Sequence, residues 1–229
     1  MPEIRRWFWD PYEEPGERGV KFRLTYEGPL LSGQKEVPSR LVHKHEIRRQ
    51  FHPQLRDFWQ VNPGLKFMAG YYRLRSDRPM IDEIADRYVR SYGHRFLPIA
   101  RKEMNLMCKL EVLLLRRPAA GGGIYSSGDL DNRLKTLIDA LEVPKDGGGL
   151  PETGPLEGEQ PYFYALLDDD NIISHLSVET DYLFGDIAKI GTDGKLLPRD
   201  QHDVRAILTV TLEPYSKSSA TAMDGDIFG

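Results

Sequence analysis

The spacing of apolar residues divides the chain into strands and helices. Residues 20–26 alternate apolar and polar side chains with a period of two, which predicts a half-buried strand. Residues 107–116 are mostly apolar, which predicts a central strand, and the residues from 204 to 214 alternate cleanly, which predicts another. A fourth strand is predicted over 172–182. The chain therefore carries enough strand pattern for one sheet.

Helical spacing occurs in three stretches. Leu130, Leu134, Leu137, Ile138 and Leu141 form the apolar stripe of an amphipathic helix packed on a core. Residues 39–60 predict a helix, or two helices meeting near Pro53, since proline breaks or kinks a helix interior. A shorter helix is predicted over 81–92, whereas 62–80 resembles a loop with a possible short strand at 71–75.

The strongest chemical signal stands at the start of the amphipathic stripe. Asp129 and Asp131 precede it, Asn132 follows, and Lys135 lies one turn beyond Asp131 on the same face. One aspartate would suffice to cap the helix, so a second carboxylate and a lysine exceed what capping needs. The bland interpretation, a helix cap alone, is weaker once the later acidic residues are considered.

Those later residues are Asp168, Asp169 and Asp170, which lie in a row at the end of an apolar run. Adjacent carboxylates repel one another unless they are solvated or share a cation. Clusters of oxygen ligands suit Mg²⁺, with Mn²⁺ as a possible substitute. The sequence alone leaves open which of the three reaches a metal.

These two stretches, GDLDNRLKTLIDAL and LLDDDNIISHLSV, resemble the RusA-type Holliday junction resolvases, which are small Mg²⁺-dependent endonucleases of bacteria and phages. The resemblance extends over about residues 107–214. It implies that Asp129, Asp131 and Asp169 bind metal, with Asp168 as an acidic neighbour and further candidate ligand. It also implies that Lys135 is catalytic and that Asn132 lies beside the metal-binding aspartates.

The same resemblance implies a fold and a partner. We expect an α/β (α+β) domain with a mixed, largely antiparallel sheet, one helix packed on one face, and extra N-terminal helices. The domain should span 20–215, between an irregular arm over 1–19 and a disordered tail over 216–229, with insertions at about 40–100 and 143–161. Family members act as homodimers on four-way DNA junctions, because cutting two opposed strands requires two active sites.

The charge distribution fits a nucleic-acid partner. The net charge of −4 argues against one, but residues 1–115 hold 21 Lys and Arg against 15 Asp and Glu, and the remainder hold 10 against 20. A basic half beside an acidic half suits a phosphate-binding surface next to a metal site. The candidate DNA contacts are Asn132 within the motif and, outside it, Arg48, Arg49, Arg73, Arg75, Arg116 and Arg117.

Composition bears on zinc binding and on the cellular compartment, and it leaves two other function classes open. Three histidines, His43, His45 and His52, lack ligand spacing for zinc and are expected to be solvated on the helix. Cys108 is the single cysteine, and there is no run of 18 apolar residues and no signal core, so we expect a cytoplasmic protein; the resemblance implies that it is bacterial or phage-encoded. Two other classes stay open: a branched-DNA binder without catalysis, and a metal-dependent glycosyl- or nucleotidyltransferase.

Overall fold

The computed structural model describes residues 19–31, 38–72, 77–116, 130–145, 150–184 and 202–214. The sequence expectations for the N-terminal arm before residue 19, the loop 117–129 and the tail after 214 lie outside these ranges. Within them, the elements that carry the fold are β1 (Val20–Pro29), α2 (Pro38–Val61), α3 (Pro63–Gly70), α4 (Met80–Asp86), β2 (Phe96–Ala100), β3 (Leu106–Arg116), α5 (Leu130–Asp139), β4 (Phe163–Leu167), β5 (Ile173–Tyr182) and β6 (Asp203–Pro214).

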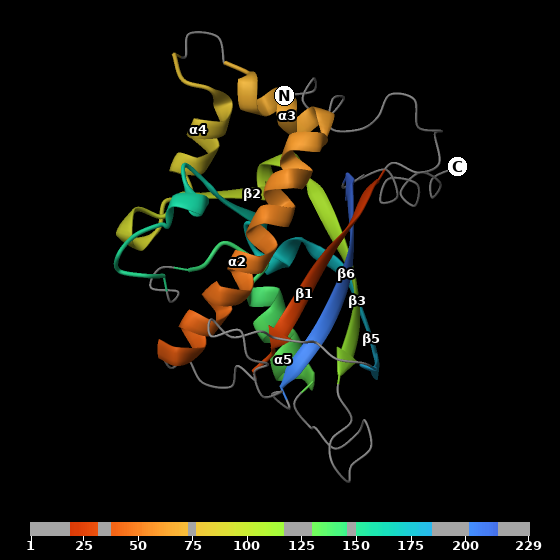
Figure 1. Cartoon of the computed structure of the whole chain (residues 1–229). Helices are drawn as coiled ribbons and strands as arrows, with labels where there is room; N and C mark the ends of the chain where they lie inside the picture. The colour runs from red at the N-terminus through yellow and green to blue at the C-terminus, as the bar shows by residue number, and fades with distance from the viewer. Residues whose placement is uncertain are drawn as a thin grey trace, which may run out of the picture.

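The main sheet has four strands in the order β1-β6-β3-β5. The pairs β1–β6 and β6–β3 are antiparallel and β3–β5 is parallel, so the expected mixed, largely antiparallel sheet is confirmed. Helices α2 and α5 lie on one face of this sheet (Figure 1). A second, two-stranded parallel sheet joins β2 to β4.

The core lies between the main sheet and the helices. Alternate residues of β3 and β6, such as Leu110, Val112, Leu208 and Val210, are at most 2% exposed and face the helices. Trp59 of α2 is buried in the same cluster. The alternation follows from the strand pleat, which sends successive side chains to opposite faces.

Two helices differ from the sequence expectation. Helix α2 is continuous through Pro53, whereas a break was one of the two interpretations. The stretch after α2 was expected to be a loop, but it contains α3, whose first turn is capped by the Asn62 side chain accepting a hydrogen bond from Leu65 N at 3.1 Å. Pro63 occupies the first helical position, where the missing N–H costs nothing.

The helix predicted over 81–92 is shorter than expected. Helix α4 ends at Asp86, and Tyr92 adopts a left-handed backbone with φ of 60° in the turn before β2. Strand β2 itself was not predicted. Its five residues are all buried, so no alternation marks it as a strand.

The packing of β6 yields a test of the core. Replacing Leu208, which is 0% exposed, with alanine should cost about 2–5 kcal/mol in the free energy of unfolding, because the surrounding side chains relax only partly around the cavity. The control is Val61→Ala, at a side chain that is 75% exposed, which should change stability by about 0.5 kcal/mol or less. Urea denaturation of both variants measures the difference; equal losses would contradict this core.

Candidate metal and nucleic-acid site

Helix α5 presents the DxDNxxK motif at its N-terminal end. Leu137 is 1% exposed and anchors the helix to the core, and Leu130, Leu134 and Ile138 pack against the same cluster. Asp131 and Lys135, one turn apart, are both exposed. Asp129 lies outside the described residues. The motif therefore offers one carboxylate and one ammonium group to solvent on the polar side of a firmly packed helix.

Two arginines lie close to this end of the helix. Burial lowers the pKa of Arg116, at the end of β3, and the positive charge of Arg133 lowers it further, so the two guanidinium groups are near one another. Arg133 Nη2 also lies 3.1 Å from His202 Nδ1, at the start of β6. Arg133 is buried at 9% exposed, so Lys135 and the partly exposed Arg116 are the cations of this region that an anion such as a phosphate can reach.

The acidic triplet lies elsewhere, at the end of β4. Asp168 is half-buried and its Oδ2 accepts hydrogen bonds from Tyr88 Oη and Lys102 N, both at 3.2 Å. Burial raises the pKa of Asp168 despite these bonds. Asp169 Oδ1 accepts from Asn171 N at 3.0 Å, and this bond is the largest cause of its lowered pKa. Lys102 Nζ also contacts Asp169 Oδ2 at 3.4 Å.

The backbone connects this triplet to the C-terminal end of α5. Leu166 N and Leu167 N donate to Leu141 O at 3.0 and 3.1 Å, and Val143 N donates to Leu167 O at 2.9 Å. Asp131 precedes Asp139, the last residue of α5, by eight residues, or about 12 Å of helix.

The described residues therefore do not bring Asp131 together with Asp168 and Asp169. Among them, no three His, Cys, Asp or Glu side chains are grouped closely enough to hold a metal ion. The motif and the triplet occupy opposite ends of one helix.

Arg48 does not suit the expected DNA contact. It is 4% exposed and donates from Nη2 to Asp139 O at 2.7 Å and from Nε to Glu142 O at 3.3 Å. Burial lowers its pKa to about 10. A guanidinium group on the carbonyl of Asp139, the last residue of α5, caps that helix, and sequence spacing could not distinguish this role from a solvent-facing charge.

The remaining predicted contacts fall into two groups. Arg49 is about one-third exposed and its Nε donates to Glu159 Oε1 at 2.6 Å, so it holds the loop after residue 150 against α2. Arg73, Arg75 and Arg117 lie outside the described residues. Asn132 is partly exposed on α5, beside Asp131.

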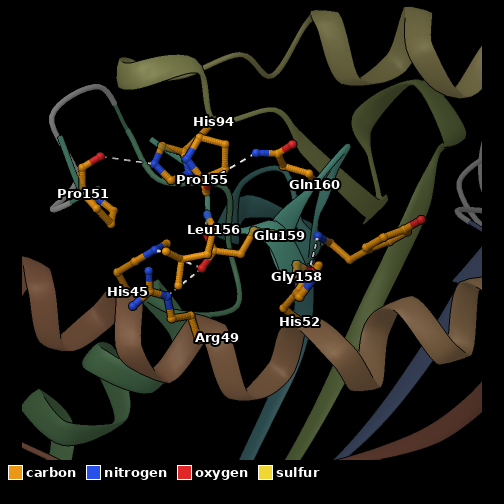
Figure 2. Close-up of polar contacts among 11 residues, drawn as sticks. His45, Arg49, His52, His94, Pro151, Pro155, Leu156, Gly158, Glu159 and Gln160 are labelled. Atoms are coloured by element: carbon orange, nitrogen blue, oxygen red, sulfur yellow. Dashed lines mark hydrogen bonds and ion pairs between the residues drawn. The ribbon is translucent and has the colours of Figure 1, made fainter. Parts of the chain in front are cut away.

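The histidines of α2 correct another expectation. His43, His45 and His52 are buried, at 6%, 2% and 5% exposed. The loop 150–161 lies over His45 and His52, whereas His43 Nε2 accepts a hydrogen bond from Leu31 N at 3.4 Å. Figure 2 shows His45, Arg49 and His52 facing that loop from α2. The insertion predicted at 143–161 thus supplies buried residues, including Glu159 at 5% exposed.

Hydrogen bonds define the tautomer of the His52 ring. His52 Nδ1 accepts from Tyr164 N at 3.0 Å, so its Nε2 carries the proton and donates to Gly158 O at 2.9 Å (Figure 2). His45 Nε2 lies 3.9 Å from Glu159 Oε1, and neither of its ring nitrogens has a hydrogen-bond partner among the described residues. Both rings are therefore suited to the neutral form.

None of the described helices has the length and apolar character needed to cross a membrane. No protein-family model, curated protein or solved structure matches the chain, so the resemblance to RusA-type resolvases rests on the quoted residues and their order.

The buried His45 gives a pH-dependent expectation. Burial, and then the charge of Arg49, lowers its pKa from 6.5 to about 4. Between these values the unfolded chain binds the proton and the folded chain does not, so the contribution of His45 is complete above pH 6.5 and declines as the pH falls toward 4. The loss should be about 1–3 kcal/mol.

Urea denaturation across this range checks the sign. The His45→Gln variant cannot titrate, so its free energy of unfolding should fall less steeply on acidification than that of the wild type. Identical slopes in the two proteins would contradict the burial of a neutral imidazole at this position.

Proposed function

We propose that the chain is a Mg²⁺-dependent, structure-selective endonuclease that hydrolyses phosphodiester bonds in branched DNA, with four-way junctions as substrate. The observation that carries the proposal is the exposed pair of Asp131 and Lys135, one turn apart on the first turns of α5. A carboxylate can bind a metal ion, and a lysine one turn away can bind the phosphate that the metal ion contacts.

The residues of the motif fit a hard divalent ion. Mg²⁺ is commonly held by one or two carboxylates, with water and substrate phosphates completing its shell. Asp129 and Asp131 would supply the carboxylates. When bound, the ion polarises the phosphate and lowers the pKa of an attacking water.

The chain's own cations perform the remaining work. Lys135 offsets negative charge that develops on the scissile phosphate. Arg116, partly exposed at the end of β3, would attract the DNA backbone, whereas Arg133 is buried at 9% exposed. Asp169, engaged by Asn171 N and Lys102, contributes to the metal site only if a rearrangement or a second copy brings it to Asp131.

A second candidate, binding of branched DNA without cleavage, is favoured by one observation. The acidic triplet is separated from Asp131 by the length of α5 and is already occupied by contacts from Tyr88, Lys102 and Asn171. A chain that keeps the exposed Lys135 and the partly exposed Arg116 but lacks a complete metal site would still bind phosphates.

Cleavage of a synthetic four-way junction tests the motif. With Mg²⁺ or Mn²⁺ the wild type should make paired, symmetric nicks in the junction. It should make no such nicks in a matched linear duplex, and none in the junction when EDTA is added. Asp131→Asn should nearly abolish the nicks and preserve binding, and Lys135→Ala should lower the rate about 10²–10³-fold, a typical cost for one charge-stabilising group. Asp57→Asn, at another exposed helix aspartate, is the matched control.

A wild type that binds the junction without nicking it under either ion supports the binder. Comparable cleavage by Asp131→Asn and the wild type would refute the assignment of Asp131. Mg²⁺-dependent binding of a sugar nucleotide, without any DNA binding, would favour the transferase instead.

The role of Asp169 has its own test. Asparagine can accept the hydrogen bond from Asn171 N as aspartate does, so Asp169→Asn keeps the local turn. Loss of cleavage with unchanged thermal stability would place Asp169 in the metal site. Loss of cleavage is expected only if a second copy or a rearrangement brings Asp169 to the metal site. Unchanged cleavage would mean that the metal site is made by the α5 motif without Asp169.

A further inference from the structure

Strand β1 runs along helix α2 and is held to it by two glutamines. Gln50 Oε1 accepts a hydrogen bond from Glu27 N at 3.3 Å. One turn later, Gln54 Oε1 accepts from Thr25 N at 2.9 Å and Gln54 Nε2 donates to Thr25 O at 2.8 Å. These side chains occupy backbone groups on the free edge of β1 and fix the position of the strand along the helix.

The same arrangement places the N-terminal end of β1. On the turn of α2 after Gln54, Phe58 stacks on Phe22 with 3.9 Å between the ring centroids. The strand runs opposite to the helix, so Gly19, which precedes β1, lies beside the C-terminal end of α2 at Val61. The N-terminal arm, residues 1–18, therefore joins the described fold next to the start of α3.

Exposed apolar side chains gather at this end of the molecule. Val61, Phe67, Tyr71 and Tyr72 are 75%, 41%, 38% and 54% exposed, and they are four of the ten large apolar side chains exposed within the described ranges. The rings of Phe67 and Tyr71 are in contact, with their centroids 5.3 Å apart. Exposed apolar groups of this kind mark a surface that binds another segment or molecule. We term these four side chains the α3 surface.

We propose that the N-terminal arm of this chain covers the α3 surface, with the aromatic run Trp7-Phe8-Trp9 packed on Phe67 and Tyr71. Three consecutive aromatic side chains in the arm and an apolar surface on the fold are each unfavourable in water. Their contact removes both from solvent, and aromatic pairs contribute more than the buried area alone.

The connection is long enough for this contact. Trp9 precedes Gly19 by ten residues, and an extended chain of that length reaches about 33–36 Å. Helix α3 has eight residues, which is about 12 Å of helix. The arm can therefore reach any part of α3 from its fixed end at Gly19.

The charges of the connection suit the same path. Between Trp9 and Gly19 the arm holds four carboxylates and one arginine. Lys21, at the start of β1, and Lys66 of α3 are both exposed. Opposite charges therefore meet along the path, although exposed pairs contribute little each, so the aromatic contact provides most of the binding.

A segment of the same chain has an advantage over a separate partner. A short flexible connection gives the arm an effective concentration on the order of millimolar at the α3 surface. Unpaired DNA bases also stack on aromatic rings, but they would have to displace the arm. Figure 1 shows α3 at the upper end of α2 and α5 beside its lower half, so the inference does not rest on the nuclease chemistry proposed for α5.

Tryptophan fluorescence of the full chain tests the contact. The chain has three tryptophans: Trp59, which is 2% exposed, and Trp7 and Trp9 in the arm. If the arm is packed, all three are shielded. Acrylamide should then quench the wild type far less than it quenches a synthetic peptide of residues 1–18, which carries the two arm tryptophans in water.

Two substitutions on the α3 surface should release the arm. Phe67→Ala and Tyr71→Ala should each shift the equilibrium about 2–10-fold toward the free arm, which is the typical effect of one aromatic contact. The double variant should therefore be quenched more strongly and emit at longer wavelength. Val89→Ala, at a side chain that is 45% exposed outside the α3 surface, is the matched control and should leave the quenching unchanged.

Circular dichroism confirms that each variant is folded, and the comparison of the wild type with the peptide needs no variant. Arm tryptophans as accessible in the wild type as in the peptide, or no increase in the double variant, would overturn the proposal. Shielding that is lost on dilution would also overturn it, because the arm would then pack on another copy. Accessible tryptophans together with oligo-dT binding that Phe67→Ala abolishes would assign the α3 surface to DNA bases instead.

Discussion

The burial of the Arg48 guanidinium group is the constraint on which the arrangement of helices depends. A charged group that is 4% exposed needs acceptors, and the carbonyls of Asp139, the last residue of α5, and of Glu142 accept from Nη2 and Nε, while Nη1 has no hydrogen-bond partner among the described residues. Lys44 Nζ adds an ion pair to the Asp139 carboxylate at 2.6 Å. Helix α2 therefore fixes the C-terminal end of α5, and the opposite end, with Asp131 and Lys135, is left facing solvent.

A second polar layer lies under the loop 150–161. Glu159 receives Arg49 and lies beside His45, while His52 joins Tyr164 N of β4 to Gly158 O of the loop. These contacts connect α2, β4 and the loop through groups whose protonation is set by burial. Polar groups in such a layer specify one arrangement because each misplaced partner leaves a buried donor or acceptor unsatisfied.

The sheet could be predicted from the sequence because its strands carry period-two or continuous apolar patterns, and α5 because its stripe is regular. Strand β2 could not be predicted, because its five residues, FLPIA, are too few to show a period. Helix α3 was missed as well, although Asn62-Pro63 is a recognisable helix start. At the site, the exposure of Asp131 and Lys135 follows from the stripe. The separation of the acidic triplet from Asp131 depends on how β4 docks beside Leu141, a long-range contact that residue order does not contain.

Gln50 and Gln54 of α2 hydrogen-bond to the backbone of β1 and thereby limit the growth of the sheet. A sheet with two open edges can add copies without limit, and such open-ended addition leads to fibres. Gln50 and Gln54 occupy backbone groups on one side, so the described sheet can extend in one direction only. Any strand added to the described sheet therefore has to pair with β5, because addition at β1 would first have to break these glutamine hydrogen bonds.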